Sequence, residues 1–497
     1  MVCTPCGCYV SVVKRDRDGK TSSPAAGEFL FEIDEQPLSE TITAWGGVPL
    51  LARAIRSLEV PSSAGRHLHI KQRERGFDDA TYIESFLVLN GVGGDCLEDF
   101  DLLREDAGLA ELLGHGIPSA EAARKFLNQF HDQEKMAAAQ QQLALDRVAY
   151  IPGESTPLEG LAAVNRDVVR ELGRRVASEK VATVDLDATI IESWKRAAKP
   201  TYKGVTGYQP VLALWSEMNV VVADEFRDGN VPAAYALLPV ARRAFQALPE
   251  TVTQFYFRGD SACEEDGLLT WLRDEKRQDG PQGKIGFAVS ARMCPALHAE
   301  ILRIPEAGWQ AYSEDSTAIK ECAEVVDYVP EESAWNRYRE PLRYVAIRIR
   351  KKQDELFADG SAVKHFAVTS NMWDWPAKKL LQWHREKAGS IEAAHDVIKN
   401  ELAGGTMPSK YFGANAAWLR LAVLTFNVLT ALKRLALPPE LLAARPKRLR
   451  FLIFTTPGKL VHHARRTLLR LTRAWNRFGN WRGAFALLPV AAQASGT

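Results

Sequence analysis

Apolar residues in the first third of the chain recur with the spacing of amphipathic helices. One such set comprises Leu50, Leu51, Ala54, Ile55 and Leu58. Ser119 precedes another set and is a favourable N-cap residue. The pattern predicts a mainly helical region from 28 to 175. Residues 1–27 are polar and are expected to form a flexible leader.

At about residue 180 the spacing changes to that of β-strands. Short apolar runs rich in β-branched and aromatic residues lie at 181–186, 208–215, 220–226, 255–257 and 285–289. Helical patterns separate the last three of them, at 232–248 and 267–272. This order of elements predicts a mixed α/β domain whose sheet is not all parallel.

The stretch 301–364 has a different character, because short strand patterns at 309–312, 324–328 and 344–349 are joined by polar loops. We expect a mainly β insertion there. A strand at 366–369 and helices at 376–387, 391–402 and 415–435 follow, with Ser390 as the N-cap of the second helix. The chain thus predicts one α/β core, made of 176–300 and 365–435, and a C-terminal segment, 436–497.

The composition is that of an ordinary soluble protein. Of 497 residues, 46% are apolar and 25% are charged, so a large core can be buried. No apolar run near the ~18 residues of a membrane span and no signal peptide pattern are found, which predicts a cytoplasmic protein. Seven cysteines are too few for a disulfide scaffold. The cluster of Cys3, Cys6 and Cys8 lacks a fourth zinc ligand, and we expect reduced thiols there.

The net charge of +1 conceals an uneven distribution. From Leu441 to Thr497 the chain contains 11 lysines and arginines and no acidic residue, so the preceding residues hold 52 basic and 62 acidic side chains. A basic segment on an acidic body suggests a polyanionic partner. Its aromatic residues, among them Phe451 and Trp481, argue against a purely disordered tail.

Three acidic residues stand out by their positions in the predicted elements. Asp187 closes the first strand, Asp260 follows the strand at 255–257, and Glu392 lies in a helical pattern. Asp185 shares one side of its strand with Asp187 and is an alternative to it. Taken singly, each acid has an ordinary explanation as a turn residue, a helix cap or part of a solvated face. Together they can hold two divalent metal ions, an arrangement that cleaves phosphodiester bonds.

Five segments resemble the DDE transposases of bacterial insertion sequences, in particular the group 1 DDE type and the insertion-sequence family numbered thirteen-eighty. They are 184–189 (VDLDAT), 201–210 (TYKGVTGYQP), 258–261 (RGDS), 384–392 (HREKAGSIE) and 412–418 (FGANAAW). The resemblance covers roughly residues 45–470. Because the first Asp of the family commonly precedes a small residue and Ser or Thr, it maps onto Asp187; the other two acids map onto Asp260 and Glu392.

This resemblance implies a ribonuclease H-like catalytic core with a mainly β insertion, a helical N-terminal region for DNA binding or assembly, and a basic C-terminal segment. Asp187, Asp260 and Glu392 would be both catalytic residues and ligands of two Mg²⁺ ions, with Mn²⁺ as a substitute. The implied reaction is cleavage at transposon ends and joining of these ends to target DNA. The implied partners are terminal inverted repeats, target DNA and a second copy in a homodimeric end complex on the bacterial nucleoid.

Basic and aromatic residues near these segments are candidates for DNA contacts. Related transposases carry Tyr and Arg before the Glu and Lys after it; Lys399 fits the last place, whereas Arg385 and Ala388 stand at the first two. We therefore expect His384, Arg385 and Lys387 to take over these DNA contacts. The other candidates are Tyr202, Lys203, Arg448, Arg450, Arg465 and Arg466.

Two other functions are compatible with these residues. A DNA-binding protein derived from a transposase could have lost catalysis while keeping the fold, although the presence of all three acids counts against it. A carboxylate-dependent hydrolase acting on sugars would fit the acidic body of the chain, but the acid-free C-terminal segment favours a nucleic acid.

Overall fold

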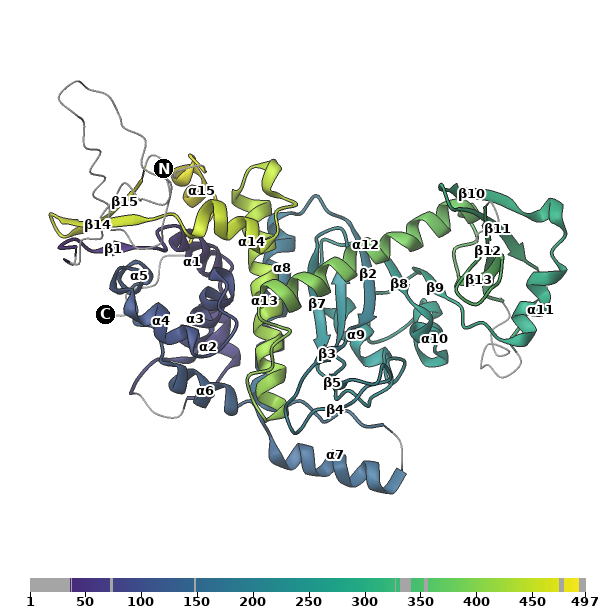
Figure 1. The fold of residues 1–497 in the computed structure, drawn as a ribbon, viewed down its shortest axis with the longest axis horizontal. Coiled ribbons are helices and arrows are strands. Elements are labelled where there is room, and N and C mark those ends of the chain that lie inside the picture. The colour runs from purple at the N-terminus through teal and green to yellow at the C-terminus, as the bar shows by residue number, and fades with distance from the viewer. Residues whose placement is uncertain are drawn as a thin grey trace, which may run out of the picture.

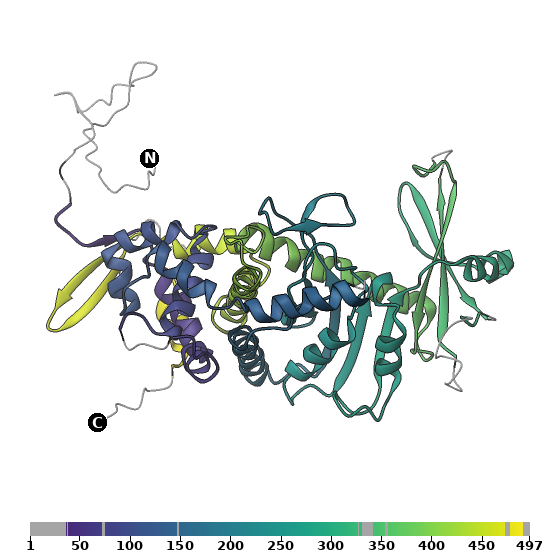
Figure 2. The same cartoon turned by 90° about the horizontal axis from the view of Figure 1, so that it is seen from below.

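The computed structural model describes residues 36, 38–71, 75–146, 149–326, 328–330, 341–352, 356–472 and 478–490. The predicted leader, with Cys3, Cys6 and Cys8, lies outside these residues. The described chain is elongated (Figure 1, Figure 2). Helices from the N-terminal third and the C-terminal segment form one end, a large sheet forms the centre, and a smaller β-rich part forms the other end.

The helices predicted in the N-terminal third are present. They are α1 (Val48–Ser57), α2 (Val60–His67), α3 (Asp79–Val92), α4 (Asp99–Glu105), α5 (Ala107–Leu113), α6 (Ala120–Asn128), α7 (Gln133–Asp146) and α8 (Thr156–Arg175). Ser119 caps α6 as expected, because its side chain accepts a hydrogen bond from the backbone N–H of Ala122. The apolar sides of α1, α3, α6 and α8 pack on α13 (Phe412–Ala436), which comes from much later in the sequence.

α13 is the central core helix. Contrary to the expectation from sequence, it is long and apolar enough to cross a membrane, but the apolar stretch is entirely buried inside the fold. Its polar residues are paired within the protein: Arg420 forms ion pairs with Asp224 and Glu154. Since Asp224 belongs to the central sheet, α13 joins the N-terminal helices to that sheet.

The central sheet has the strand arrangement of a ribonuclease H-like fold, which confirms the predicted mixed α/β core. β2 (Val181–Ala188), β6 (Val211–Trp215) and β7 (Val220–Glu225) are antiparallel neighbours, whereas β8 (Gln254–Gly259) and β9 (Ile285–Ser290) run parallel to β2. The order across the sheet is β7-β6-β2-β8-β9. α9 (Leu238–Ala247) lies between β7 and β8 in sequence, and α10 (Asp266–Arg273) lies between β8 and β9.

The predicted strand 208–215 is broken in two. Its first residue ends β5 (Thr206–Tyr208), which forms a small sheet with β3 (Ile191–Glu192) and β4 (Lys199–Pro200), and only Val211–Trp215 joins the central sheet. Pro210 lies at the break and has no N–H to donate to a ladder. The small sheet therefore directly follows β2 in the sequence and stands beside the strand end that carries Asp187.

The β-rich insertion extends the central sheet. After α11 (Pro295–Arg303), the strands β10 (Gln310–Glu314), β11 (Ala318–Val325), β12 (Arg343–Lys351) and β13 (Val363–Ser370) pair antiparallel in sequence order, and β13 pairs with β9. β11 begins earlier than the predicted strand at 324–328. Its first half is polar and is held by cross-strand ion pairs from Glu321 to Arg348 and Arg350, which a hydrophobic pattern does not reveal.

The helices predicted at 376–387 and 391–402 are a single helix, α12 (Ala377–Glu401), which runs unbroken through Gly389. Ser390, the expected N-cap, instead donates its hydroxyl to the backbone oxygen of Lys387 and to Asp185. This finding corrects the prediction, because Glu392 lies in the middle of a long helix and not in a first turn.

The C-terminal segment is folded over its described residues. α14 (Pro446–Leu449) continues into a π-helical turn (Arg450–Phe454), which is followed by the hairpin β14 (Gly458–His463) and β15 (Arg466–Leu471) and by α15 (Trp481–Ala486). β1 (Ile42–Thr43) pairs with β14, so the segment folds against the N-terminal helices.

Candidate active site

Asp187 and Asp260 lie at one edge of the central sheet. β2 and β8 are parallel neighbours in which Leu186 pairs with Gly259, so the next residue of each strand brings the two aspartates together. The carboxyl ends of parallel strands are a common place for a site in an open α/β sheet. Burial raises the pKa of Asp260, and the negative charge of Asp187 raises it further. The two carboxylates therefore repel each other and favour a cation between them.

α12 supplies a cation to this pair. The Nζ atom of Lys387 lies 3.3 Å from Oδ1 of Asp187, and only 8% of the lysine surface is exposed. Against the effect of burial, the same ammonium lowers the pKa of Asp260. Lys387 thus neutralises part of the acid pair from inside the protein.

Glu392 lies on α12 near this group. His395, one turn further along the helix, has its Nδ1 atom 3.7 Å from Oδ2 of Asp187, and burial lowers its pKa to about 3, so the imidazole is neutral. Glu392 is exposed and forms no hydrogen bond or ion pair with a described residue. A residue three positions before His395 shares its side of the helix. Glu392 is thus within one helical turn of the residue of α12 that contacts Asp187.

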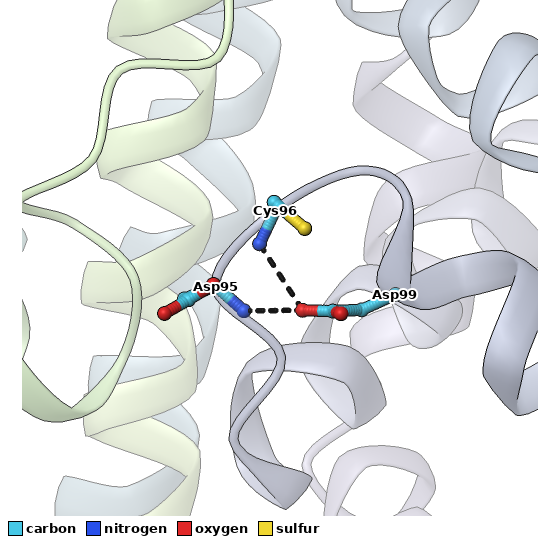
Figure 3. Close-up of side chains that lie close together, drawn as sticks. All are labelled: Asp95, Cys96 and Asp99. Atoms are coloured by element: carbon cyan, nitrogen blue, oxygen red, sulfur yellow. Dashed lines mark hydrogen bonds between the residues drawn. The ribbon is translucent and has the colours of Figure 1, made fainter.

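The three acids are not yet gathered around one point. Among the described residues, their carboxylate oxygens do not all lie within 4.8 Å of one another, whereas those ligand atoms of Asp95, Cys96 and Asp99 do. Figure 3 shows this second group, in which Asp99 accepts hydrogen bonds from the backbone N–H groups of Asp95 and Cys96. These three side chains lie close together because they belong to the turn that precedes and starts α4.

Asp185, the alternative to Asp187, is engaged elsewhere. It is fully buried, and Arg258 donates to its two carboxylate oxygens over 2.6 and 2.9 Å. Ser390 donates a further hydrogen bond from α12. Because these internal donors occupy its carboxylate, Asp185 joins β2, β8 and α12 and is less accessible to a ligand than Asp187.

Arg258 also fixes α12 over the strand ends. Besides Asp185, its guanidinium donates to the backbone oxygen of Trp383 at 2.6 Å, to Ser216 at 2.9 Å and to Glu386 at 3.3 Å. Sequence reasoning missed this network. The sequence feature that could have indicated it is the position of Arg258 at the end of an apolar strand, because a buried charge requires partners.

The predicted DNA contacts on α12 divide into two groups. The Nε2 atom of His384 donates a hydrogen bond of 3.1 Å to the backbone oxygen of Gly259, and burial lowers the pKa of His384 to about 4. Like Lys387, it faces the sheet. Arg385 is exposed, and its guanidinium interacts with the hydroxyl of Tyr312 in the β-rich insertion. The inward direction of His384 and Lys387 argues against direct DNA contacts for them in this arrangement.

Lys399, Lys203 and Tyr202 form a group beside the acids. Lys399 donates to the backbone oxygen of Ile190 at 3.3 Å; burial lowers its pKa, and the nearby charge of Lys203 lowers it further. Tyr202 is 73% exposed, and the Lys203 ammonium lies 5.9 Å from its ring centroid. The structure therefore brings together candidates that are nearly 200 residues apart in the sequence.

The candidates in the C-terminal segment also differ from one another. Arg448, Arg465 and Arg466 are exposed. Arg450 instead donates to the backbone oxygens of Asn90, Gly91 and Glu401. These contacts occupy Arg450 within the protein and argue against the DNA contact predicted for it.

The donor set of the acid group suits a hard divalent ion. Asp187, Asp260 and Glu392 offer carboxylate oxygens only, which Mg²⁺ and Mn²⁺ prefer. The Lys387 ammonium indicates a position between the two aspartates at which positive charge is stabilised. The residues present therefore fit such an ion.

Comparison with known proteins identifies the family. The model of the transposase DDE domain group 1 family matches residues 35–489. Among solved structures, a cryo-EM structure of the piggyBac transposase synaptic complex with hairpin DNA is similar, with 10% sequence identity, a TM-score of 0.42, and 77% of this chain and 74% of that chain covered. No curated protein matches. Because the family model spans most of its length, the chain belongs to the group 1 family of transposase DDE domains.

Proposed function

We propose that this protein is an active DNA transposase of a bacterial insertion sequence, of the insertion-sequence family numbered thirteen-eighty. It would cleave DNA at the ends of its element and join these ends to target DNA. The carrying observation is the pair of Asp187 and Asp260 at the carboxyl edge of parallel strands, beneath the helix that bears Glu392. Membership of a transposase family argues against the sugar hydrolase.

Asp187, Asp260 and Glu392 would hold two Mg²⁺ ions, or Mn²⁺ in their place. The ions would supply charge stabilisation at the attacking and leaving oxygens of a phosphodiester. The contribution of the protein is placement, because adjacent strands fix the two aspartates and Arg258 fixes α12. Glu392 has no competing partner among the described residues, so it is free to turn to the other two acids.

The DNA strand would lie along exposed cations beside these acids. Lys203 and Lys399 stand on one side, and Arg385 extends from α12 on the solvent side. Such contacts position the phosphate backbone without reading its sequence. Pairing of two transposon ends requires two active sites, and we propose a homodimer that acts on nucleoid DNA in the cytoplasm.

A plasmid carrying the inverted repeats that flank the gene tests the proposal. Wild-type protein should nick it at the repeat ends in Mg²⁺ or Mn²⁺. Asp187→Ala, Asp260→Ala and Glu392→Ala should each abolish nicking and leave binding of the ends within about threefold, because phosphate contacts supply most of the affinity. Glu440→Ala is the matched control and should remain active, since this acid is, like Glu392, exposed and its side chain forms no ion pair or hydrogen bond with a described residue.

A second candidate is a DNA-binding protein without catalysis. It is favoured by one observation: the ligand atoms of Asp187, Asp260 and Glu392 do not all lie within 4.8 Å of one another. End binding without nicking in either metal ion, by a folded wild-type protein, would establish this alternative and reject the active transposase.

A further inference from the structure

The hairpin β14–β15 projects from the end of the molecule opposite the β-rich insertion (Figure 1, Figure 2). One side of it packs on α5: Leu460 is buried next to Gly108, and His462 lies 2.7 Å from Glu111. Because side chains alternate along a strand, the other side points away from α5. That outer side is made of three cross-strand pairs: Lys459–Arg470, Val461–Leu468 and His463–Arg466.

The outer side concentrates positive charge. Lys459 lies 3.0 Å from Glu40, but the side chains of Arg465, Arg466 and Arg470 form no ion pair or hydrogen bond with the described part of the chain. Lys459 and Arg470 stand directly opposite each other, and like charges in that position destabilise a ladder. A bound polyanion would remove this repulsion.

The turn at the tip is an independent observation. Ala464 and Arg465 both have positive φ, at 48° and 63°. Two-residue hairpin turns of this geometry usually hold Asn-Gly, because a Cβ atom is strained there. Strain of this kind is typical of functional sites. Here it holds the Arg465 side chain at the apex of the hairpin, where solvent surrounds it.

We propose that the outer side of β14–β15 binds duplex DNA, with Arg465, Arg466 and Arg470 on phosphates. The proposal rests on the proposed function and assigns part of the end binding to this hairpin. The major groove admits a two-stranded β-ribbon, and basic side chains at the tip and along the ribbon suit the phosphate backbones that border the groove. Val461 and Leu468 supply an apolar strip between them.

The place of the hairpin determines which part of the DNA it meets. β2, which contains Asp187, and β8, which Asp260 follows, lie in the centre of the molecule, whereas the hairpin lies at one end (Figure 1). A duplex that reaches both would meet the hairpin at a distance from the cleaved bond. The hairpin therefore contributes to holding the end and not to the chemistry.

The first test uses the full-length triple variant Arg465→Ala/Arg466→Ala/Arg470→Ala and fluorescence anisotropy with a labelled mixed-sequence DNA duplex. Loss of three phosphate contacts should weaken binding about tenfold or more and flatten the slope of log K against log salt by about 2 to 3 units. The matched control Lys276→Ala/Lys284→Ala/Arg303→Ala removes the same charge from other exposed positions and should leave the slope nearly unchanged. A hairpin variant with wild-type affinity and slope would overturn the proposal.

The second test separates DNA contact from a structural role. Arg465→Gly and Ala464→Gly both relieve a positive φ and should raise the melting temperature. Only Arg465→Gly should lose DNA affinity. Equal affinity of the two variants would show that the arginine does not meet DNA.

Plasmid nicking by wild-type protein is measured in parallel, so that the two proposals fail separately. Normal nicking together with unchanged binding by the hairpin variants rejects the hairpin contact alone. Absence of nicking by wild-type protein, together with weakened binding by the hairpin variants, rejects the active transposase and supports the hairpin contact.

Discussion

The Nζ atom of Lys387 lies 3.3 Å from the carboxylate of Asp187. The lysine comes from α12 and the aspartate from the end of β2, so the ion pair joins this helix to the sheet. The same ammonium also acts on Asp260. A divalent ion held by both aspartates would weaken this ion pair, so Lys387 would compete with the proposed metal.

Lys387→Met should therefore tighten binding of Mn²⁺ to the protein without DNA. Removal of a like charge within about 5 Å of the ion is worth more than a tenfold change in affinity at an effective dielectric constant near 20. Isothermal titration calorimetry measures the change. Lys378→Met, an exposed lysine at the start of the same helix, is the control and should bind Mn²⁺ like wild type. Unchanged affinity of Lys387→Met would contradict the competition.

Asp185→Asn and Asp187→Asn should have opposite profiles. Asp185→Asn leaves the buried Arg258 without its anion and should lower the free energy of unfolding by about 3 to 5 kcal/mol. Asp187→Asn should abolish cleavage and change stability far less, because Asp187 is partly exposed. Urea unfolding and plasmid nicking of both variants check this. An inactive, stable Asp185→Asn beside an active Asp187→Asn would reverse the assignment of the ligand.

Asp228→Asn should stabilise the protein in a pH-dependent manner. Burial raises the pKa of Asp228 to about 6. Because the folded pKa is above the unfolded one, the penalty of the charged form is nearly absent below pH 4, grows between pH 4 and pH 6 and is complete above pH 6. The variant should gain about 3 kcal/mol in the free energy of unfolding at pH 7.5, but only about 1 kcal/mol at pH 4.5. Equal gains at both pH values would contradict the titration.

Metal removal and readdition should show whether the metal acts at Asp187 and Asp260 or at the cluster of Asp95, Cys96 and Asp99. Nicking should stop in a strong chelator and return with Mg²⁺ or Mn²⁺. Mn²⁺ should raise the melting temperature of wild type but not of Asp187→Asn/Asp260→Asn. Asp95→Asn/Asp99→Asn is the control and should keep the Mn²⁺ effect, since its turn is explained by backbone hydrogen bonds. Full nicking in the chelator would exclude the metal mechanism.

Lys399→Ala should weaken formation of the end complex or strand transfer, and Lys399→Arg should restore part of it. The ammonium stands at the loop before β3, beside Lys203, where a phosphate can bridge the two. A gel shift assay with transposon-end DNA measures complex formation. If Lys399→Ala forms the end complex and transfers strands like wild type, Lys399 does not contact DNA and its role is limited to the hydrogen bond with the backbone of Ile190.

The sheet and its two aspartates were predictable because the signals are local. The strand and helix patterns from Val181 to Val289 are clearly distinguishable, and each aspartate stands where such a strand ends. Local signals did not predict that the two expected helices at 376–387 and 391–402 form the single helix α12. Gly389 and Ser390 are common at helix boundaries, but Ser390 finds its partner in Asp185, more than 200 residues away.

The sequence also did not reveal which basic side chains point into the protein. In the sequence, His384, Lys387 and Arg450 look like solvent-exposed basic residues. In the structure they form hydrogen bonds or ion pairs with carbonyl and carboxylate groups of distant segments. Only the tertiary structure shows which basic residues are satisfied by the protein and which remain for DNA. The excess charge of residues 441–497 could be predicted, but its division between scaffold and surface could not.

Arg450 gives the C-terminal segment a role in the construction of the molecule. Its guanidinium binds the carbonyl groups that end α3 and the last residue of α12, and Gly46 and Gly47 leave room for the backbone that follows it. Deleting the chain after Pro438 would thus remove the buried Leu449, Ile453 and Phe454 and open both helix ends. The C-terminal segment therefore holds the ends of α3 and α12 together. Its contribution to DNA affinity has to be measured by substituting single side chains in the full-length protein, because truncation would disturb the fold.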